Sequence, residues 1–279
     1  MSAAVAADLG RLFALDAVRR AAAGLLLGGL FLPIVGVLVV GLDVLTARLA
    51  MMHVALAGIA IGLWIGVDPT MLGLLCCGVV GAAVAPLADR ATGLSGPMGL
   101  VMTLAMAFAL LVLSISGVNA NGAFSLLWGS ILATRTTDLV LLALLATAVL
   151  GWTARRHRDV ALVLFDREIA ACSGVHVRAI TMTALVLVSL SIGASVRLTG
   201  ALLVDALTIL PALTARALAA TLRSMFVLAV VAGLVGNGLG FLLALELDQP
   251  LGPILVLVSG ALTLLSYLKK GITHAPAFH

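Results

Sequence analysis

Long apolar runs separated by short polar turns recur along the whole chain. The first of them, residues 21–41, contains no charged side chain and is long enough to cross the hydrocarbon core of a bilayer as an α-helix. Lipid offers no hydrogen-bond partner to backbone N–H and C=O groups, so such runs must satisfy these groups internally as helices. We therefore predict an all-α polytopic membrane protein.

Composition limits what else the chain can contain. Of its 279 residues, 63% are hydrophobic and 10% are charged, whereas roughly 25% of the residues in a soluble domain are charged. A chain of this length holds about 8–10 transmembrane helices and little more. Residues 1–279 are therefore expected to form one transmembrane domain without a separate soluble domain.

The apolar runs predict nine crossings, at 21–41, 51–67, 71–88, 97–117, 139–153, 179–196, 197–216, 225–245 and 252–268. Residues 124–133, FSLLWGSILA, are too short to cross and are expected to form an interfacial or re-entrant helix. If Lys269 and Lys270 are cytoplasmic, nine crossings put Arg19 and Arg20 outside, against the positive-inside rule. Counting 124–133 as a crossing would instead return the N-terminus to the cytoplasm.

The formal charge of +4 comes from basic residues gathered in short turns between apolar runs. The strongest cluster is Arg155, Arg156, His157 and Arg158, and we assign its loop to the cytoplasm. This distribution reflects membrane topology and does not indicate nucleic acid binding. Residues 160–178 follow the cluster, are amphipathic and are too polar to span, so they should lie at the cytoplasmic surface.

Motifs of several enzyme classes are missing from the sequence. Lys269 and Lys270 are the only lysines, and neither fits the phosphate-binding pattern GxxxxGK[ST]. The patterns GxSxG and HExxH do not occur. We therefore expect no enzyme activity and no cofactor bound by this chain. No cleaved leader is expected either, because charged residues interrupt the first twenty positions.

Residues 197–216, RLTGALLVDALTILPALTAR, carry a single acid, Asp205, within an apolar stretch. An aspartate near the bilayer centre costs roughly 2.5–3.5 kcal/mol, so Asp205 should face a bundle interior or a polar cavity. Pro211 and the run 206–208 favour a broken or short span lining a pathway. The alternative is a core helix with a neutral, hydrogen-bonded aspartic acid.

His53 lies close to the start of a predicted span and follows Met51 and Met52. Imidazole binds zinc and similar ions, and thioethers suit softer metals. His53, Met52 and Asp205 could therefore form a sparse site for a transient divalent cation, although a lone histidine on a helix is more often a packed polar residue. Cys76, Cys77 and Cys172 lack zinc-finger or CxxC spacing and are expected to be packing residues.

Residues 165–216 resemble the ZnuB/MntB-like permeases, the membrane subunits of ABC importers for zinc, manganese and related metals. The family pattern joins F-D-x-E-x-A-x-x-x-G to a later V-G-A-L-L-x-x-A-L-L-x-x-P-A-x-T-A-R. Residues 53–69 and LLWGSILA resemble further family elements. The matching positions are Phe165, Asp166, Glu168, Ala170, Gly174, Gly200, Ala201, Leu202, Leu203, Ala206, Leu207, Pro211, Ala212, Thr214, Ala215 and Arg216.

The resemblance implies a type II ABC importer-like permease fold and a homodimer in the cytoplasmic membrane of a prokaryote. It also implies two kinds of partner, an ATPase subunit that binds ATP and an extracytoplasmic metal-binding protein. On this template Phe165, Asp166, Glu168 and Gly174 belong to the element that couples to the ATPase. The pathway helix would carry residues Gly200, Pro211 and Thr214.

The sequence departs from the family pattern where metal would bind. The family usually has G-D-x-x-x-H ahead of its second span, and here His53 is kept while the aspartate is replaced by Leu49. We hypothesise that Asp205 supplies the missing carboxylate across the pathway. The leading interpretation is a metal-importer permease for zinc or manganese. The alternatives are a permease scaffold that carries another solute and a secondary ion-coupled carrier.

Overall fold

The computed structural model describes residues 15–89, 95–117 and 134–273, and every regular element within these ranges is helical. This agrees with the all-α prediction. Residues 124–133 lie outside the described ranges. The helices are α2 (Asp16–Gly41), α3 (Leu45–Ile65), α4 (Pro69–Val84), the 3-10 turn η1 (Ala85–Asp89), α5 (Ser95–Ile115), α7 (Thr136–Arg155), α8 (His157–Phe165), α9 (Arg167–Cys172), α10 (Val177–Leu218), α11 (Leu222–Leu247) and α12 (Leu251–Thr273).

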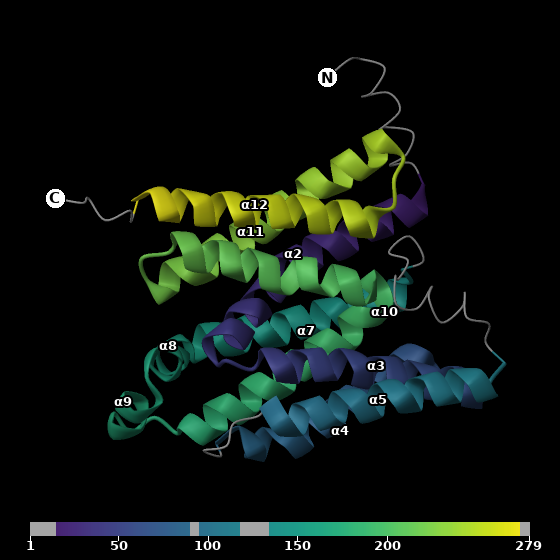
Figure 1. The fold of residues 1–279 in the computed structure, drawn as a ribbon, viewed down its shortest axis with the longest axis horizontal. Helices are drawn as coiled ribbons and strands as arrows, with labels where there is room; N and C mark the ends of the chain where they lie inside the picture. Colours follow the sequence, from purple (N-terminus) through teal and green to yellow (C-terminus); the bar gives the residue numbers. More distant parts are fainter. Residues whose placement is uncertain (1–14, 90–94, 118–133, 274–279) are drawn as a thin grey trace.

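Eight helices within the described ranges are long and apolar enough to span a bilayer, including the first part of α10, Val177–Val196. The backbone of α10 is broken at Gly200, whose φ of 78° and ψ of 159° are open to glycine and strained for other residues. Figure 1 shows the chain running back after this break, beside α2. We call residues 200–218 the return segment. Adding it to the eight spans gives nine passages, within the predicted range.

The break was predicted near Pro211, and this position was wrong. The helix continues through Pro211 to Leu218. Proline removes one N–H from the helix ladder, but a helix with packed neighbours can keep its direction at that point. The chain breaks instead at Gly200, with a positive φ that glycine adopts far more easily than other residues.

Different helix ends lie at the two ends of the described bundle. Figure 1 shows the start of α2 at the same end as the bend in α10, whereas α8, α9 and the end of α12 lie at the opposite end. Arg19 in α2 and Lys270 in α12 are therefore on opposite sides of the bundle. This is the arrangement that nine crossings predict.

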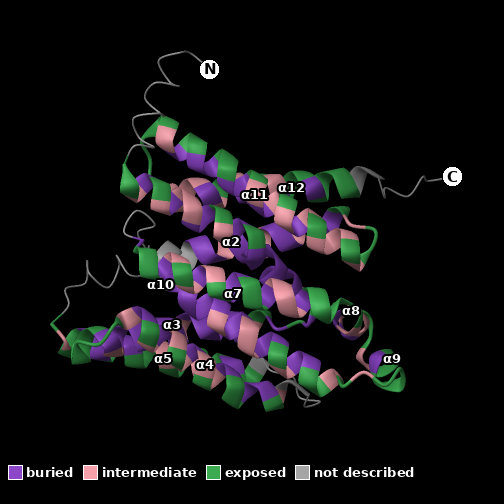
Figure 2. Cartoon of the chain, turned by 180° about the vertical axis from the view of Figure 1, so that it is seen from behind, coloured by how far each residue is buried: buried purple, intermediate pink, exposed green. Residues whose placement is uncertain are grey.

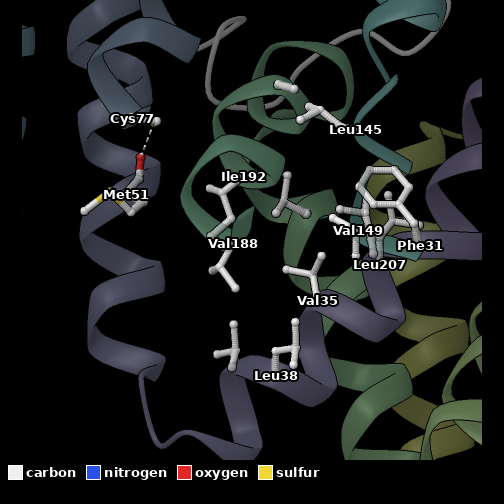
Figure 3. Close-up of a cluster of buried hydrophobic side chains, with 14 of the residues drawn as sticks. Phe31, Val35, Leu38, Met51, Cys77, Leu145, Val149, Val188, Ile192 and Leu207 are labelled. Carbon is white, nitrogen blue, oxygen red and sulfur yellow. Dashed lines mark hydrogen bonds between the residues drawn. The ribbon is translucent and has the colours of Figure 1, made fainter. Parts of the chain in front are cut away.

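Helix α2 forms the centre of the bundle. Of its most apolar window 72% is buried, against 22% for the windows of α5 and α12. Figure 2 shows the same contrast, with buried residues concentrated in the middle and exposed ones on the outer helices. In Figure 3, Phe31 and Val35 of α2 pack near Val149 of α7 and Ile192 of α10. The outer faces of α5 and α12 are thus left to meet lipid.

Small residues bring α3 and α4 together. A Cβ atom on Gly58 would lie 2.7 Å from Cα of Gly73 in α4. A Cβ atom on Gly62 would come equally close to Cα of Pro69. Gly66 has a different role, because it ends α3 in the left-handed conformation.

The cysteines differ in burial. Cys77 is buried and its thiol donates to the carbonyl oxygen of Met51 at 3.4 Å, as drawn in Figure 3. Cys76 is half-buried. Both agree with a packing role. Cys172 is exposed at the end of α9, so its assignment as a packing residue was wrong.

Substituting Gly36 by alanine should destabilise the bundle, because the added Cβ would overlap the backbone carbonyl of Thr208 in the return segment. Overpacking of this kind lowers the free energy of unfolding by about 1–3 kcal/mol. Gly238→Ala is the matched control, since its Cβ meets nothing within 4 Å. Thermal unfolding of the purified protein in detergent would measure both. Equal unfolding temperatures for the two variants would contradict the close contact.

Candidate functional site

Asp205 lies in the return segment, among hydroxyl groups that already have hydrogen-bond partners. The Thr208 hydroxyl donates to the carbonyl of Val204 at 2.6 Å. The Thr214 hydroxyl donates to the carbonyl of Leu210 at 2.9 Å and lies 2.9 Å from the hydroxyl of Thr263 in α12. The contact between Thr214 and Thr263 joins the return segment to α12. Asp205 differs from these residues because its side chain is charged and pairs with a charged residue of α3.

The carboxylate of Asp205 forms an ion pair with Arg48 through Oδ1 and Nη2. Arg48 is in the first turn of α3 and its side chain is 3% exposed, whereas that of Asp205 is 42% exposed. Leaving one buried charge without its partner costs about 3–5 kcal/mol, so each charge stabilises the other. Asp205 is therefore a paired carboxylate in this structure, which argues against the neutral aspartic acid alternative.

Arg48 also joins Met52 to this pair. Its Nη2 donates to Sδ of Met52, one turn later in α3, at 3.5 Å. His53 makes a different contact, since its Nδ1 lies 2.9 Å from the carbonyl oxygen of Leu49 in the same helix. The structure thus brings Met52 and Asp205 to one guanidinium. Within the described ranges, no hydrogen bond or ion pair joins His53 to Asp205.

No group of three or more His, Cys, Asp or Glu side chains gathers in the part of the chain that the structure describes. A tightly held structural metal usually needs about four such ligands. The proposed ligands therefore do not make a tight site in this conformation. A single carboxylate with a guanidinium on it can at most bind a cation weakly or transiently.

Sequence reasoning missed Arg48, which it assigned to the turn before a second span starting at residue 51. The turn is shorter than predicted, because Leu42 and Val44 are themselves buried and α3 already begins at Leu45. The sequence did contain a signal for the pairing of Arg48 with Asp205. An arginine and an aspartate each interrupt an apolar stretch, and opposite charges in spans tend to pair.

The predicted surface segment, residues 160–178, contains two short helices that meet at Asp166. Oδ1 of Asp166 accepts from the backbone N–H groups of Glu168 and Ile169, at 2.8 and 3.0 Å, and so caps α9. Glu168, in the first turn, is exposed and suits the positive end of the helix. Gly174 follows α9 with a φ of 80°. The local sequence thus specifies a sharp corner.

Phe165 stands at this corner with its side chain uncovered. It is 76% exposed, and Ile169 beside it is 49% exposed. Figure 1 shows α8 and α9 projecting at one end of the bundle, away from the faces of the long helices. A large aromatic residue in that position is typical of a surface that contacts another protein.

Helices α8 and α9 also contact the turn that leads into α3. Nη2 of Arg167 donates to the carbonyl oxygen of Leu42 at 3.4 Å. A Cβ atom on Gly41 would lie 2.7 Å from Cδ2 of Leu164, so the end of α2 packs directly on α8. A displacement of α8 and α9 would therefore act on the turn that immediately precedes Arg48.

A family model described as ABC 3 transport family matches residues 14–270. The manganese transport system membrane protein MntC of Halalkalibacterium halodurans is 26% identical over 260 residues, covering 91% of this chain and 89% of that protein. The high-affinity zinc uptake system membrane protein ZnuB of Haemophilus influenzae is 24% identical over 219 residues, covering 78% and 84%. These matches confirm the resemblance found in the sequence.

A solved structure shares the fold. A chain of PsaBC from Streptococcus pneumoniae in complex with Fab superposes with a TM-score of 0.81 at 21% identity, covering 94% of this chain and 95% of that chain. Similarity at this level of identity concerns the fold. It confirms the predicted all-α permease architecture over nearly the whole length of the chain.

Proposed function

The chain belongs to the ABC 3 transport family, and on this basis we propose that it is the permease subunit of an ATP-driven importer for a divalent transition-metal ion, zinc or manganese. Its spans and its relatives make it a multi-pass protein of the prokaryotic plasma membrane. The observation that carries the proposal is the half-exposed carboxylate of Asp205 in a membrane-spanning segment. Such a charge has to face water or another polar surface.

The energy for transport would come from a separate ATPase subunit, which binds ATP and docks on the corner formed by α8 and α9. The exposed Phe165 and the capped start of α9 suit that role. Two further partners complete the assembly that we propose. A second copy of this chain would share the pathway, and an extracytoplasmic metal-binding protein would deliver the ion.

The contacts of α8 and α9 suggest how the ATPase could act on the pathway. Movement of the corner would be passed through Arg167 and Leu164 to the α2–α3 turn, and from there to Arg48 in the first turn of α3. Arg48 holds Asp205 in the return segment. Alternating access would then open and close the ion pair in step with ATP hydrolysis.

Two observations favour a second candidate function. Leu49 replaces the aspartate of the family pattern, and no cluster of metal ligands occurs in the described ranges. A permease with the same fold and the same ATPase coupling could therefore carry a different solute. A secondary ion-coupled carrier has less support, because one carboxylate and one histidine that do not contact each other make a thin relay for a coupling ion.

Uptake into proteoliposomes would test the proposal. The permease would be reconstituted with a candidate ATPase and a candidate binding protein from the same organism, and zinc and manganese would be measured inside the vesicles with and without ATP. We expect ATP-dependent accumulation of at least one of the two ions. ATP hydrolysis without accumulation of either ion would contradict metal transport and favour the second candidate.

Arg167→Gln should weaken the coupling between ATP hydrolysis and uptake. It removes the hydrogen bond to the carbonyl oxygen of Leu42 while leaving Phe165 in place. Residues between coupled sites change the coupling free energy by about 0.5–2 kcal/mol, so a fall in ions transported per ATP of about threefold or more is expected. Arg223→Gln, at an exposed arginine in the first turn of α11, is the control. Equal ratios for the two variants would exclude Arg167 from coupling.

A further inference from the structure

The two charges of the Arg48–Asp205 pair are unequally accessible. The Arg48 side chain is almost fully buried at 3% exposure, and that of Asp205 is 42% exposed. Oδ1 of Asp205, the oxygen that faces Arg48, is itself buried. The exposure of this side chain therefore comes from its other atoms, which include Oδ2. One carboxylate oxygen holds the guanidinium and the other side of the group is open.

The open side of Asp205 has to face a polar environment. A carboxylate in a membrane-spanning segment is costly in hydrocarbon and is found facing a bundle interior or a water-filled cavity. The return segment packs against α2, where Gly36 meets Thr208, and against α12, where Thr214 meets Thr263. Asp205 is the position where it stays open, since 42% of this side chain is exposed. A cation in that space could reach Asp205 without passing Arg48.

We propose that Arg48 is a built-in competitor of the transported ion: its guanidinium occupies Asp205 when no cargo is present, and an arriving cation has to displace it. The inference rests on the proposed function, because it requires cargo that is cationic. Arg48 then controls how tightly Asp205 binds a cation and which cations it binds.

Competition of this kind favours divalent over monovalent ions. At equal distance a divalent ion attracts a carboxylate twice as strongly as a guanidinium does, whereas a monovalent ion has no such advantage. The displaced guanidinium stays close by, because Met52 and the buried start of α3 hold its side chain. Its positive charge then repels the bound ion. Binding stays weak enough for release, which transport requires.

The alternative is a purely structural ion pair that joins α3 to the return segment. Direct measurement of Zn²⁺ binding distinguishes this structural role of Arg48 from competition with the ion. We would titrate Zn²⁺ alone into the detergent-purified permease by calorimetry. If pairing leaves Asp205 free for about a tenth of the time, Arg48→Gln should bind Zn²⁺ about tenfold more tightly than the wild type. Arg48→Lys, which keeps the charge, should recover most of the wild-type Kd. Arg158→Gln serves as the distant control.

Transport kinetics provide a second test, because the loss of a purely structural ion pair would not change KM and kcat for Zn²⁺ in the same way. In proteoliposomes, Arg48→Gln should lower both KM and kcat for Zn²⁺, because a more tightly held ion is released more slowly. The double variant Arg48→Gln/Asp205→Asn removes both charges of the pair, so neither is left without its partner and the variant is expected to fold even if a single variant does not. It should bind and transport no Zn²⁺.

Two results would overturn the inference. One is an Arg48→Gln variant with unchanged affinity for Zn²⁺, and the other is a double variant that transports like the wild type. Failure of the proposed function has a different signature. It would appear in the wild type as ATP hydrolysis without uptake of zinc or manganese, whatever the calorimetry of the variants shows.

Discussion

Asp205→Asn is expected to lower ATP-dependent uptake of zinc and manganese by roughly tenfold or more. The substitution keeps the shape of the side chain and removes the charge that a divalent ion needs. It also leaves Arg48 buried without a counter-charge, which destabilises the protein by about 3–5 kcal/mol. Uptake should therefore be measured on protein shown to be monodisperse, and expressed per folded molecule.

Asp248→Asn is the matched control for this experiment. Asp248 is an exposed aspartate that follows α11 with a φ of 51°, a conformation that asparagine also adopts readily. Its removal should leave uptake unchanged. A second arm, Leu49→Asp/Asp205→Asn, places an aspartate four residues before His53, as the family pattern has it, and should restore part of the uptake. Unchanged uptake in Asp205→Asn would show that the ion does not use this carboxylate.

Phe165→Ser is expected to release the ATPase subunit and to reduce uptake by roughly tenfold or more. Aromatic residues at the centre of an interface often contribute at least about 2 kcal/mol of binding free energy. Phe165 is 76% exposed in the isolated chain, so its removal should hardly affect the fold. Co-purification of the ATPase with the tagged permease would measure the association, and thermal unfolding would confirm that the variant is folded.

The control for Phe165 is a variant that keeps the aromatic ring. Phe165→Tyr should retain most of the ATPase association, because the tyrosine ring covers the same surface. Co-purification of the ATPase with Phe165→Ser at the wild-type level would mean that the corner of α8 and α9 is not the docking site. In that case the ATPase would have to bind at another part of the cytoplasmic end.

Much of the fold could be predicted from single stretches of sequence. The spans at 21–41, 97–117 and 225–245 correspond to α2, α5 and α11, with shifts of a few residues at the ends. Their prediction succeeds because the transfer of side chains into lipid depends on composition within one run. The corner at Asp166 was predicted as a single amphipathic segment. Its division into α8 and α9 depends on one capping side chain.

The candidate site was less predictable. Asp205 was singled out because an isolated acid in an apolar run is costly, and the structure places a charge opposite it. The sequence grouped Asp205 with His53 and Met52 around a transient cation, and the structure pairs it with Arg48. Local sequence could not decide this, because the choice among distant partners depends on which helices pack together. Arg48 itself was assigned to a turn because arginine is usual between spans.

By itself the sequence determined that this chain is a helical membrane protein of the metal-type permease family, since hydrophobic length and the motif at 165–216 are properties of continuous stretches. Only the tertiary structure decided that α10 reverses at Gly200 and that Arg48 meets Asp205. Both depend on packing: Gly200 permits the reversal, but contacts with α2 hold the return segment where its aspartate reaches the start of α3.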